Sequence, residues 1–140
     1  MEMREIKKDL FKMSEDYHIA HCISSDAKMG AGIAVEFNKR FKLNVLRKSA
    51  EEGNLPIGSC HLIGRILNLI TKDKYWHKPT YESLTRAVVA MRTICIQENI
   101  KKLAMPEIGC GLDRLQWGKV KEIIENTFID TDIEIVVCRL

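Results

Sequence analysis

A single domain of the layered α/β class is the fold that the sequence predicts, and three observations predict it. The chain has 140 residues, of which 46% are apolar and 29% charged, so it can bury one compact core and is not globally disordered. Short apolar runs rich in β-branched residues alternate with segments of helical periodicity. No internal repeat, low-complexity tract or Pro/Gly/Ser linker divides the chain, so we expect residues 1–140 to form one domain.

Five apolar runs are predicted strands. They cover residues 1–6, 19–23, 61–70, 102–105 and 133–138. Gly64 can divide the third run into two strands. The last four runs are nearly continuous rather than alternating, which is typical of strands that are covered on both faces.

Three segments have the spacing of an amphipathic helix. In residues 80–97 the apolar stripe comprises Tyr81, Leu84, Ala87, Val88, Met91, Ile94 and Cys95. Pro79 keeps this helix from extending upstream, and Thr80 can cap its first turn. The stripe of residues 117–128 comprises Trp117, Val120, Ile123, Ile124 and Phe128, and the third segment opens at Ala31 and carries Ile33, Ala34, Phe37 and Phe41. Strand, loop, helix and strand then follow in the order of an α/β domain, whose ligands gather where loops leave the carboxyl ends of strands.

Charge and hydropathy exclude several classes of protein. The net charge is +3, from 22 Lys and Arg against 19 Asp and Glu, which is too small to indicate a dedicated nucleic-acid binder. No apolar run approaches the ~20 residues of a membrane span, and residues 1–10 lack the apolar core of a secretory signal. We therefore expect a soluble, monomeric, cytoplasmic protein with no membrane partner, and the nucleus as a second compartment in a eukaryote.

The five cysteines form no CxxC pair and do not lie at zinc-ligand spacing from the four histidines. We expect reduced, mostly buried thiols and no metal site. Cys110 lies between two glycines without a neighbouring base, so we interpret it as a backbone-positioning residue rather than a reactive thiol.

Two loops carry paired glycines, and each lies between a predicted strand and a predicted helix. Gly30 and Gly32 are in the first loop, residues 24–33, and Gly109 and Gly111 are in the second, residues 106–114. Glycines let the backbone approach an anion, and helix N-termini supply free N–H groups. One such loop alone would be explained by an ordinary helix entry, whereas two favour a diphosphate. Neither loop has the P-loop or Rossmann sequence, so the residues alone indicate only a phosphate-containing ligand.

At these loops the sequence resembles the macrodomain family, and within it the terminal ADP-ribose protein glycohydrolase branch. The matching segments are KKDLF at 7–11, AHCIS at 20–24, MGAGIA at 29–34, LITK at 69–72, HKPTYESL at 77–84 and MPEIGCGLDRLQW at 105–117. They occur in the same order across nearly the whole chain. The resemblance implies a three-layer α/β/α macrodomain with a central mixed sheet that binds ADP-ribose without a cofactor or metal.

The resemblance also implies roles for individual residues. Asp9 and Leu10 would recognise adenine, the two glycine loops would wrap the diphosphate and the distal ribose, and Leu140 would close over the adenosine end. His21 and Ser25 would line the same cleft. The implied ligand contacts are Asp9, Leu10, His21, Ser25, Gly30, Ala31, Gly32, Ile33, Gly109, Cys110, Gly111, Leu112 and Leu140, and Lys72 with Asp113 matches the catalytic pair of the branch.

Two positions depart from the broader family. Many hydrolytic macrodomains have an asparagine-rich first loop that positions water, whereas this chain reads His21-Cys22-Ile23-Ser24. That departure favours a lysine-based mechanism. The glycine that commonly precedes the adenine-binding aspartate is Lys8 here.

Each of these residues also has a plainer interpretation. Lys72 ends an apolar run and would otherwise be a surface lysine, Asp113 could cap a helix, and Asp9 could cap a turn. His21 lies within an apolar run, as a core histidine would. A nucleophilic lysine must react as the neutral amine, which partial burial and a neighbouring cation such as Lys74 favour. The tryptophans Trp76 and Trp117 are interpreted as packing residues, although Trp76 could border the cleft.

We therefore expect a hydrolase that removes mono-ADP-ribose from acyl-linked Glu or Asp sites of proteins. O-acetyl-ADP-ribose and ADP-ribosylated DNA bases are further substrates that the resemblance allows. Two alternatives stay open at this point: a non-catalytic ADP-ribose reader, and a phosphatase acting on ADP-ribose 1″-phosphate.

Overall fold

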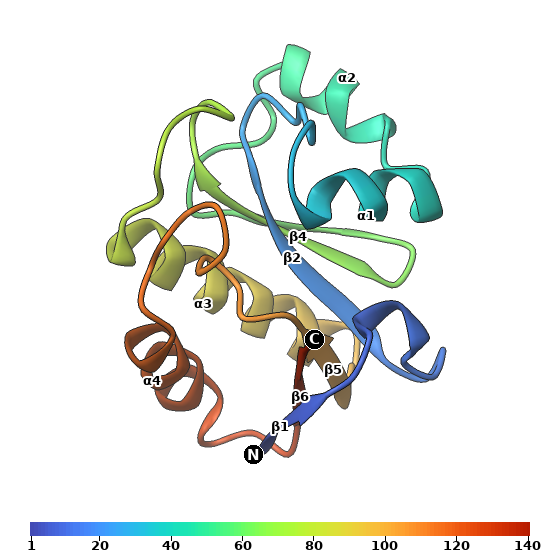
Figure 1. Ribbon diagram of the computed structural model, residues 1–140, viewed down its shortest axis with the longest axis vertical. Helices are drawn as coiled ribbons and strands as arrows, with labels where there is room; N and C mark the ends of the chain where they lie inside the picture. Colours follow the sequence, from blue (N-terminus) through green and yellow to red (C-terminus); the bar gives the residue numbers. More distant parts are fainter.

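The computed structural model describes residues 1–140 and contains a six-stranded mixed sheet between two layers of helices (Figure 1). The strands are β1 (Glu2–Lys7), β2 (His18–Ser24), β3 (Cys60–Ile63), β4 (Ile66–Lys72), β5 (Lys102–Met105) and β6 (Glu134–Arg139). Their order in the sheet is β1-β6-β5-β2-β4-β3, and all neighbouring pairs are parallel except β3 with β4. The predicted three-layer α/β/α fold with a central mixed sheet is confirmed.

Four α-helices cover the sheet, and a short 3₁₀ helix, η1 (Leu10–Lys12), follows β1. Helices α1 (Ile33–Phe41) and α2 (Val45–Glu51) lie on one face, and α3 (Tyr81–Gln97) and α4 (Trp117–Phe128) lie on the other (Figure 1). Each face has its own apolar core, of 18 and 16 buried residues.

Strand β4 shows why its sequence is apolar without alternation. Leu67 and Leu69 pack in the core beneath α3 and α4, whereas Ile66 and Ile70 pack in the core beneath α1 and α2. Successive side chains of a strand point to opposite faces, so a strand buried on both faces is apolar at most positions; Asn68 and Thr71 are the buried polar exceptions in β4.

Local signals placed several element ends correctly. Thr80 Oγ1 accepts a hydrogen bond from the Ser83 N–H at 3.0 Å, and Ser83 Oγ accepts one from the Thr80 N–H at 3.0 Å. This capping box begins α3 where the sequence predicted it. The predicted run 61–70 is two antiparallel strands, β3 and β4, and Gly64 adopts φ +60° in the turn between them.

Two features of the helices differ from the prediction. The third predicted helix begins at Ile33 rather than Ala31, because Gly32 has φ +62° and ψ −152°, which no helix accommodates. Helix α2 was not predicted. It has only seven residues and one fully buried side chain, Leu46, so its sequence carries little periodicity.

The five parallel strands all end at one edge of the sheet, which we call the carboxyl edge. The loops that follow β1, β6, β5, β2 and β4 therefore lie next to one another in that order. No helix combines the length and the apolar character needed to cross a bilayer.

Candidate active site

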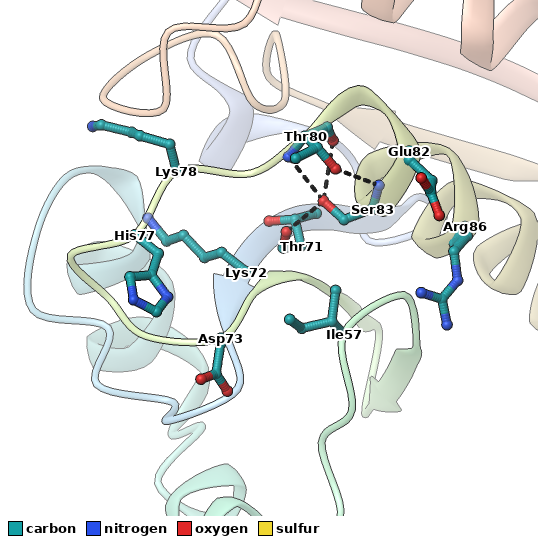
Figure 2. A pocket seen from close by; sticks show the side chains of 10 residues that line it. All are labelled: Ile57, Thr71, Lys72, Asp73, His77, Lys78, Thr80, Glu82, Ser83 and Arg86. Atoms are coloured by element: carbon teal, nitrogen blue, oxygen red, sulfur yellow. Dashed lines mark hydrogen bonds between the residues drawn. The ribbon is translucent and has the colours of Figure 1, made fainter.

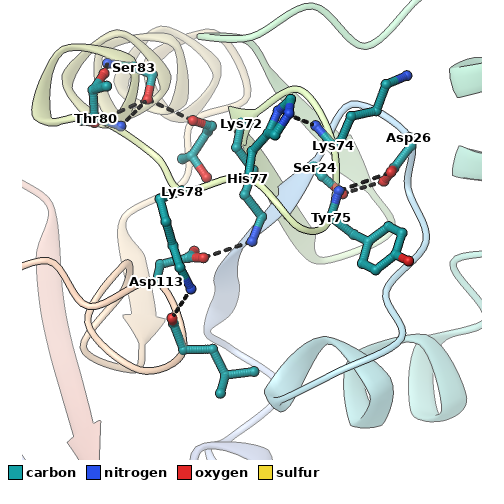
Figure 3. A network of polar contacts seen from close by, with 12 residues as sticks. Ser24, Asp26, Lys72, Lys74, Tyr75, His77, Lys78, Thr80, Ser83 and Asp113 are labelled. Carbon is teal, nitrogen blue, oxygen red and sulfur yellow. Dashed lines mark hydrogen bonds and ion pairs between the residues drawn. The ribbon is translucent and has the colours of Figure 1, made fainter.

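Lys72 and Asp113 meet at the carboxyl edge. Lys72 is the last residue of β4, and Asp113 lies in the loop after β5. Lys72 Nζ donates a hydrogen bond to Asp113 Oδ1 at 2.7 Å, and each side chain is 14% exposed (Figure 3). The structure thus pairs an amine with a carboxylate in a partly buried position, as nucleophilic catalysis with proton transfer requires.

The cation near this pair is not the predicted one. The Lys74 side chain points away from Lys72 Nζ (Figure 3), whereas Lys78 Nζ donates to the carbonyl oxygen of Leu112 at 2.6 Å, next to Asp113. Sequence reasoning missed Lys78, although it lies in the HKPTYESL segment that carries the resemblance.

The plainer interpretation of Asp113 as a helix cap is wrong. Helix α4 begins at Trp117, and its N-cap residue is Gln116. Asp113 lies three residues upstream, and its carboxylate bonds Lys72 instead.

The two glycine loops approach each other. A Cβ atom on Gly32 would lie 3.1 Å from Leu112 Cδ1, which is tighter than ordinary van der Waals contact. The backbone N–H groups of residues 29–32 donate no hydrogen bond within the chain, and neither do those of Gly111 and Leu112. These free donors lie on both loops, which suits an anionic ligand between them.

Both loops contain backbone conformations that residues with a side chain rarely adopt. Ala27 and Met29 in the first loop have φ of 51° and 49°, and Arg114 in the second has φ 62°. Such conformations cost free energy and cluster at binding and catalytic sites.

Three predicted adenine-side residues lie at the ends of β1 and β6. Asp9 Oδ1 accepts a hydrogen bond from the Phe11 N–H at 3.0 Å, so Asp9 caps η1 as its plainer interpretation held. Leu10 as a whole residue is only 4% exposed and packs in the core beneath α1 and α2. Leu140, at the end of the chain after β6, is 95% exposed.

Ser25 lies beside Lys72, because the Ser25 N–H donates to the Lys72 carbonyl oxygen at 2.8 Å. The next residue, Asp26, ties the first loop to the turn after β4. Its carboxylate accepts hydrogen bonds from the Ser24 hydroxyl and from the Tyr75 N–H at 2.9 Å (Figure 3), and also from the Lys28 N–H at 3.2 Å. Burial opposes the charged form, but these hydrogen bonds lower the pKa of Asp26. No pattern in the sequence distinguished Asp26.

His21 does not reach the cleft, so its predicted ligand contact is corrected. Its side chain is fully buried, with the ring stacked on Phe37 at 3.9 Å and Nε2 2.6 Å from Asn68 Oδ1. Burial lowers the pKa of His21 to about 4, so the ring is neutral at physiological pH. His21 is a core histidine that helps to hold α1 against β2.

The cysteines are all free thiols, two of them buried and three half-buried. Burial, with a smaller contribution from Glu107, raises the pKa of Cys110 to about 11, so its thiol is protonated at neutral pH. This agrees with the interpretation that Cys110 is not a reactive thiol.

Only one of the two tryptophans packs as predicted. Trp117 Nε1 donates to Glu5 Oε1 at 2.7 Å and joins α4 to β1. Trp76 is 67% exposed, so its interpretation as a packing residue is wrong.

Next to Lys72 lies an open cavity of about 510 Å³ between the end of β4 and the start of α3 (Figure 2). Its lining is almost entirely polar and includes His77, Lys78, Thr80 and Arg86. Lys72 therefore has an approach from solvent through this cavity, which no residue of either glycine loop lines.

No protein-family model matches the chain. The human ADP-ribose glycohydrolase OARD1 is 46% identical over 140 aligned residues, which cover 96% of this chain and 90% of that protein. Among solved structures, the macrodomain of Thermus aquaticus DarG matches with a TM-score of 0.89 and 21% identity, over 99% of this chain and 98% of that one. DarTG of Thermosipho africanus, in complex with ADP-ribose, matches with a TM-score of 0.87 and 19% identity, over 99% of this chain and 42% of that one.

The two structures share the fold with this chain. The identity to OARD1 extends along nearly the whole of both sequences, so this chain belongs to the macrodomain family, in the branch of the ADP-ribose glycohydrolase OARD1.

Proposed function

We propose that this protein is an ADP-ribose glycohydrolase that releases mono-ADP-ribose from acyl-linked glutamate and aspartate residues of proteins. The observation that carries the proposal is the partly buried Lys72–Asp113 pair, with Nζ and Oδ1 2.7 Å apart at the carboxyl edge. The activity that gives the human relative OARD1 its name supports it.

The order of the strands supports the assignment of ADP-ribose as the ligand. The predicted adenine contacts follow β1 and β6, the glycine loops follow β5 and β2, and Lys72 ends β4. Along the sheet, the expected contacts therefore run in the order of the ligand itself: adenosine, diphosphate and distal ribose.

In the first step Asp113 accepts a proton from the Lys72 ammonium group, and the neutral amine attacks C1″ of the distal ribose. The bond between C1″ and Nζ forms as the bond between C1″ and the ester oxygen breaks. The substrate carboxylate leaves with the bonding electron pair, and Asp113 passes its proton to solvent.

In the second step water releases the sugar. The Asp113 carboxylate takes a proton from water as the water oxygen bonds C1″, and the bond between C1″ and Nζ breaks. Lys72 leaves as the amine and recovers the proton from Asp113, which restores the ion pair. One ester and one water molecule have become a carboxylate, a free ADP-ribose and one released proton.

The test replaces Lys72 by alanine and uses Lys39→Ala as the matched control, because Lys39 is an exposed lysine of α1 that lines neither the cavity next to Lys72 nor the larger cavity beside it. Substrates are glutamate-ADP-ribosylated protein, O-acetyl-ADP-ribose and an ADP-ribosylated DNA oligonucleotide, with release followed by mass spectrometry. We expect Lys72→Ala to bind ADP-ribose without releasing it from protein, and Lys39→Ala to behave as wild type.

Borohydride added during turnover reduces the iminium form of the sugar adduct and should leave the mass of ADP-ribose on Lys72. Full turnover by Lys72→Ala refutes the mechanism. A wild-type protein that binds ADP-ribose but releases it from no substrate is a reader instead. One that acts only on ADP-ribose 1″-phosphate is a phosphatase.

A further inference from the structure

A second, larger cavity of about 920 Å³ lies beside the proposed active site, and the mechanism above does not use it. It runs between the first glycine loop, the end of α2, residues 53–57 and the turn that follows Lys72. We call it the Trp76 groove and define it by six of its lining residues: Asp26, Arg47, Leu55, Ile57, Tyr75 and Trp76.

The groove opens where a leaving group emerges from the active site. Ile57 and Asp73 line both the groove and the cavity that contains Lys72 (Figure 2). None of the paired glycines of the two loops lines either cavity, so the groove lies beyond the expected diphosphate site, where a group attached to the ribose can extend.

Two adjacent aromatic side chains form the exposed rim of the groove. Tyr75 is 57% and Trp76 67% exposed. The Tyr75 backbone is held by Asp26, so the rim is fixed relative to the first glycine loop. Exposed tryptophan and tyrosine side chains are the residues most enriched among the energetic centres of protein interfaces.

The charges of the groove distinguish a polypeptide from a nucleic acid. Three cationic and three anionic side chains line it: Lys28, Arg47, Lys74, Asp26, Glu51 and Asp73. A groove for nucleic acid carries an excess of positive charge along the phosphate backbone. Balanced charges beside an apolar wall match a polypeptide, whose side chains carry both signs.

The wall also offers a main-chain hydrogen-bond donor. The N–H group of the half-buried Ile57 donates no hydrogen bond within the chain, whereas Leu55 is only 3% exposed and supports the wall from beneath. Free backbone donors next to apolar pockets are what an extended peptide binds.

From these observations we infer that the Trp76 groove binds the polypeptide segment that flanks the ADP-ribosylated residue. The inference rests on the proposed function and names the macromolecule that carries the ester. The side chains of Tyr75 and Trp76 supply the contact area, and the Ile57 N–H supplies a main-chain hydrogen bond.

The test compares two substrates that carry the same ester. One is a nonapeptide whose central glutamate is ADP-ribosylated, and the other is the ADP-ribosyl ester of N-acetylglutamate amide, which has no flanking residues. The variant is Tyr75→Ala/Trp76→Ala, and Ile129→Ala is the control, because Ile129 is as exposed as Trp76, at 67%, but outside the groove. We expect the double variant to lower kcat/KM for the peptide by about tenfold, the loss typical of removing an interface anchor. The rate on the amide ester should not change, and Ile129→Ala should match wild type on both.

An equal loss on both esters, or no loss on the peptide, overturns the inference. A loss confined to an ADP-ribosylated single-stranded oligonucleotide overturns it in favour of nucleic acid. If the wild-type protein hydrolyses neither ester, the proposed function fails. The inference about the Trp76 groove is then tested by whether the groove binds a peptide. For this measurement the protein is labelled with 5-fluorotryptophan, and the unmodified nonapeptide is titrated into it while fluorine NMR spectra are recorded. The Trp76 signal is assigned as the one that is missing from the spectrum of the Trp76→Phe variant. A shift of that signal supports the groove, and an unmoved signal overturns it.

Discussion

Replacing Gly32 by alanine tests whether the two glycine loops form the diphosphate site. Gly32 has φ +62° and ψ −152°, a conformation open almost only to glycine, and the added Cβ would lie 3.1 Å from Leu112 Cδ1. Holding a residue with a side chain there costs about 1–3 kcal/mol. Relief of this strain would turn the N–H groups of the first loop away from the second loop. We therefore expect the free energy of unfolding to fall by about 1–3 kcal/mol and the affinity for ADP-ribose to fall by about tenfold or more.

The matched control is Gly64→Ala. Gly64 has φ +60° in the hairpin between β3 and β4, and nothing lies within 4 Å of its added Cβ. This variant should lose stability through its backbone alone and keep wild-type affinity for ADP-ribose. Urea unfolding measures the first quantity and isothermal titration calorimetry the second. Equal affinity of Gly32→Ala and Gly64→Ala for ADP-ribose would refute the assignment of the loops.

Two further predictions concern proton transfer and pH. Asp113→Asn keeps a hydrogen-bond acceptor for Lys72 but cannot take its proton, so kcat should fall about 10²–10⁴-fold. Isothermal titration calorimetry should show that the variant still binds ADP-ribose. A wild-type kcat in this variant would contradict the role of Asp113. His21 is held neutral by burial, with its pKa lowered from 6.5 to about 4, so the unfolded chain binds more protons between these values. The stability that the neutral His21 confers is therefore complete above pH 6.5 and declines as the pH falls toward 4. Urea unfolding at several pH values measures this decline in the free energy of unfolding, and His21→Gln should make it less steep between pH 6.5 and 4. The same slope in the variant and in the wild type would contradict the role of His21.

The fold was predictable because its signals are local. The apolar runs, the Thr80 cap and the two glycine loops each occupy a few consecutive residues, and each gave nearly the right boundaries. Helix α2 gave no such signal, because seven residues with a single fully buried side chain, Leu46, are held by tertiary contacts rather than by a pattern of their own.

The site was predictable only in part, because its contacts join distant parts of the chain. Lys78 reaches the carbonyl oxygen of a residue 34 positions away, and Asp26 binds the backbone of Tyr75, 49 positions away. A histidine in an apolar strand fits a core or a cleft equally well, and only the stacking of His21 on Phe37 decides between them. The exposure of Trp76 was equally out of reach, since a turn residue is exposed or buried according to what packs over it.

The strand order also limits where substrate selection can arise. The loops after β1, β6, β5 and β2 are assigned to ADP-ribose itself, which is the same in every substrate. Beyond β4 the sheet has only β3, and the surface there consists of the turn after Lys72 and the segment that leads into β3. The part of the substrate that differs from one macromolecule to another must therefore contact that turn and that segment. It follows that changes at Tyr75 and Trp76 should alter which macromolecule is accepted and leave the affinity for free ADP-ribose unchanged.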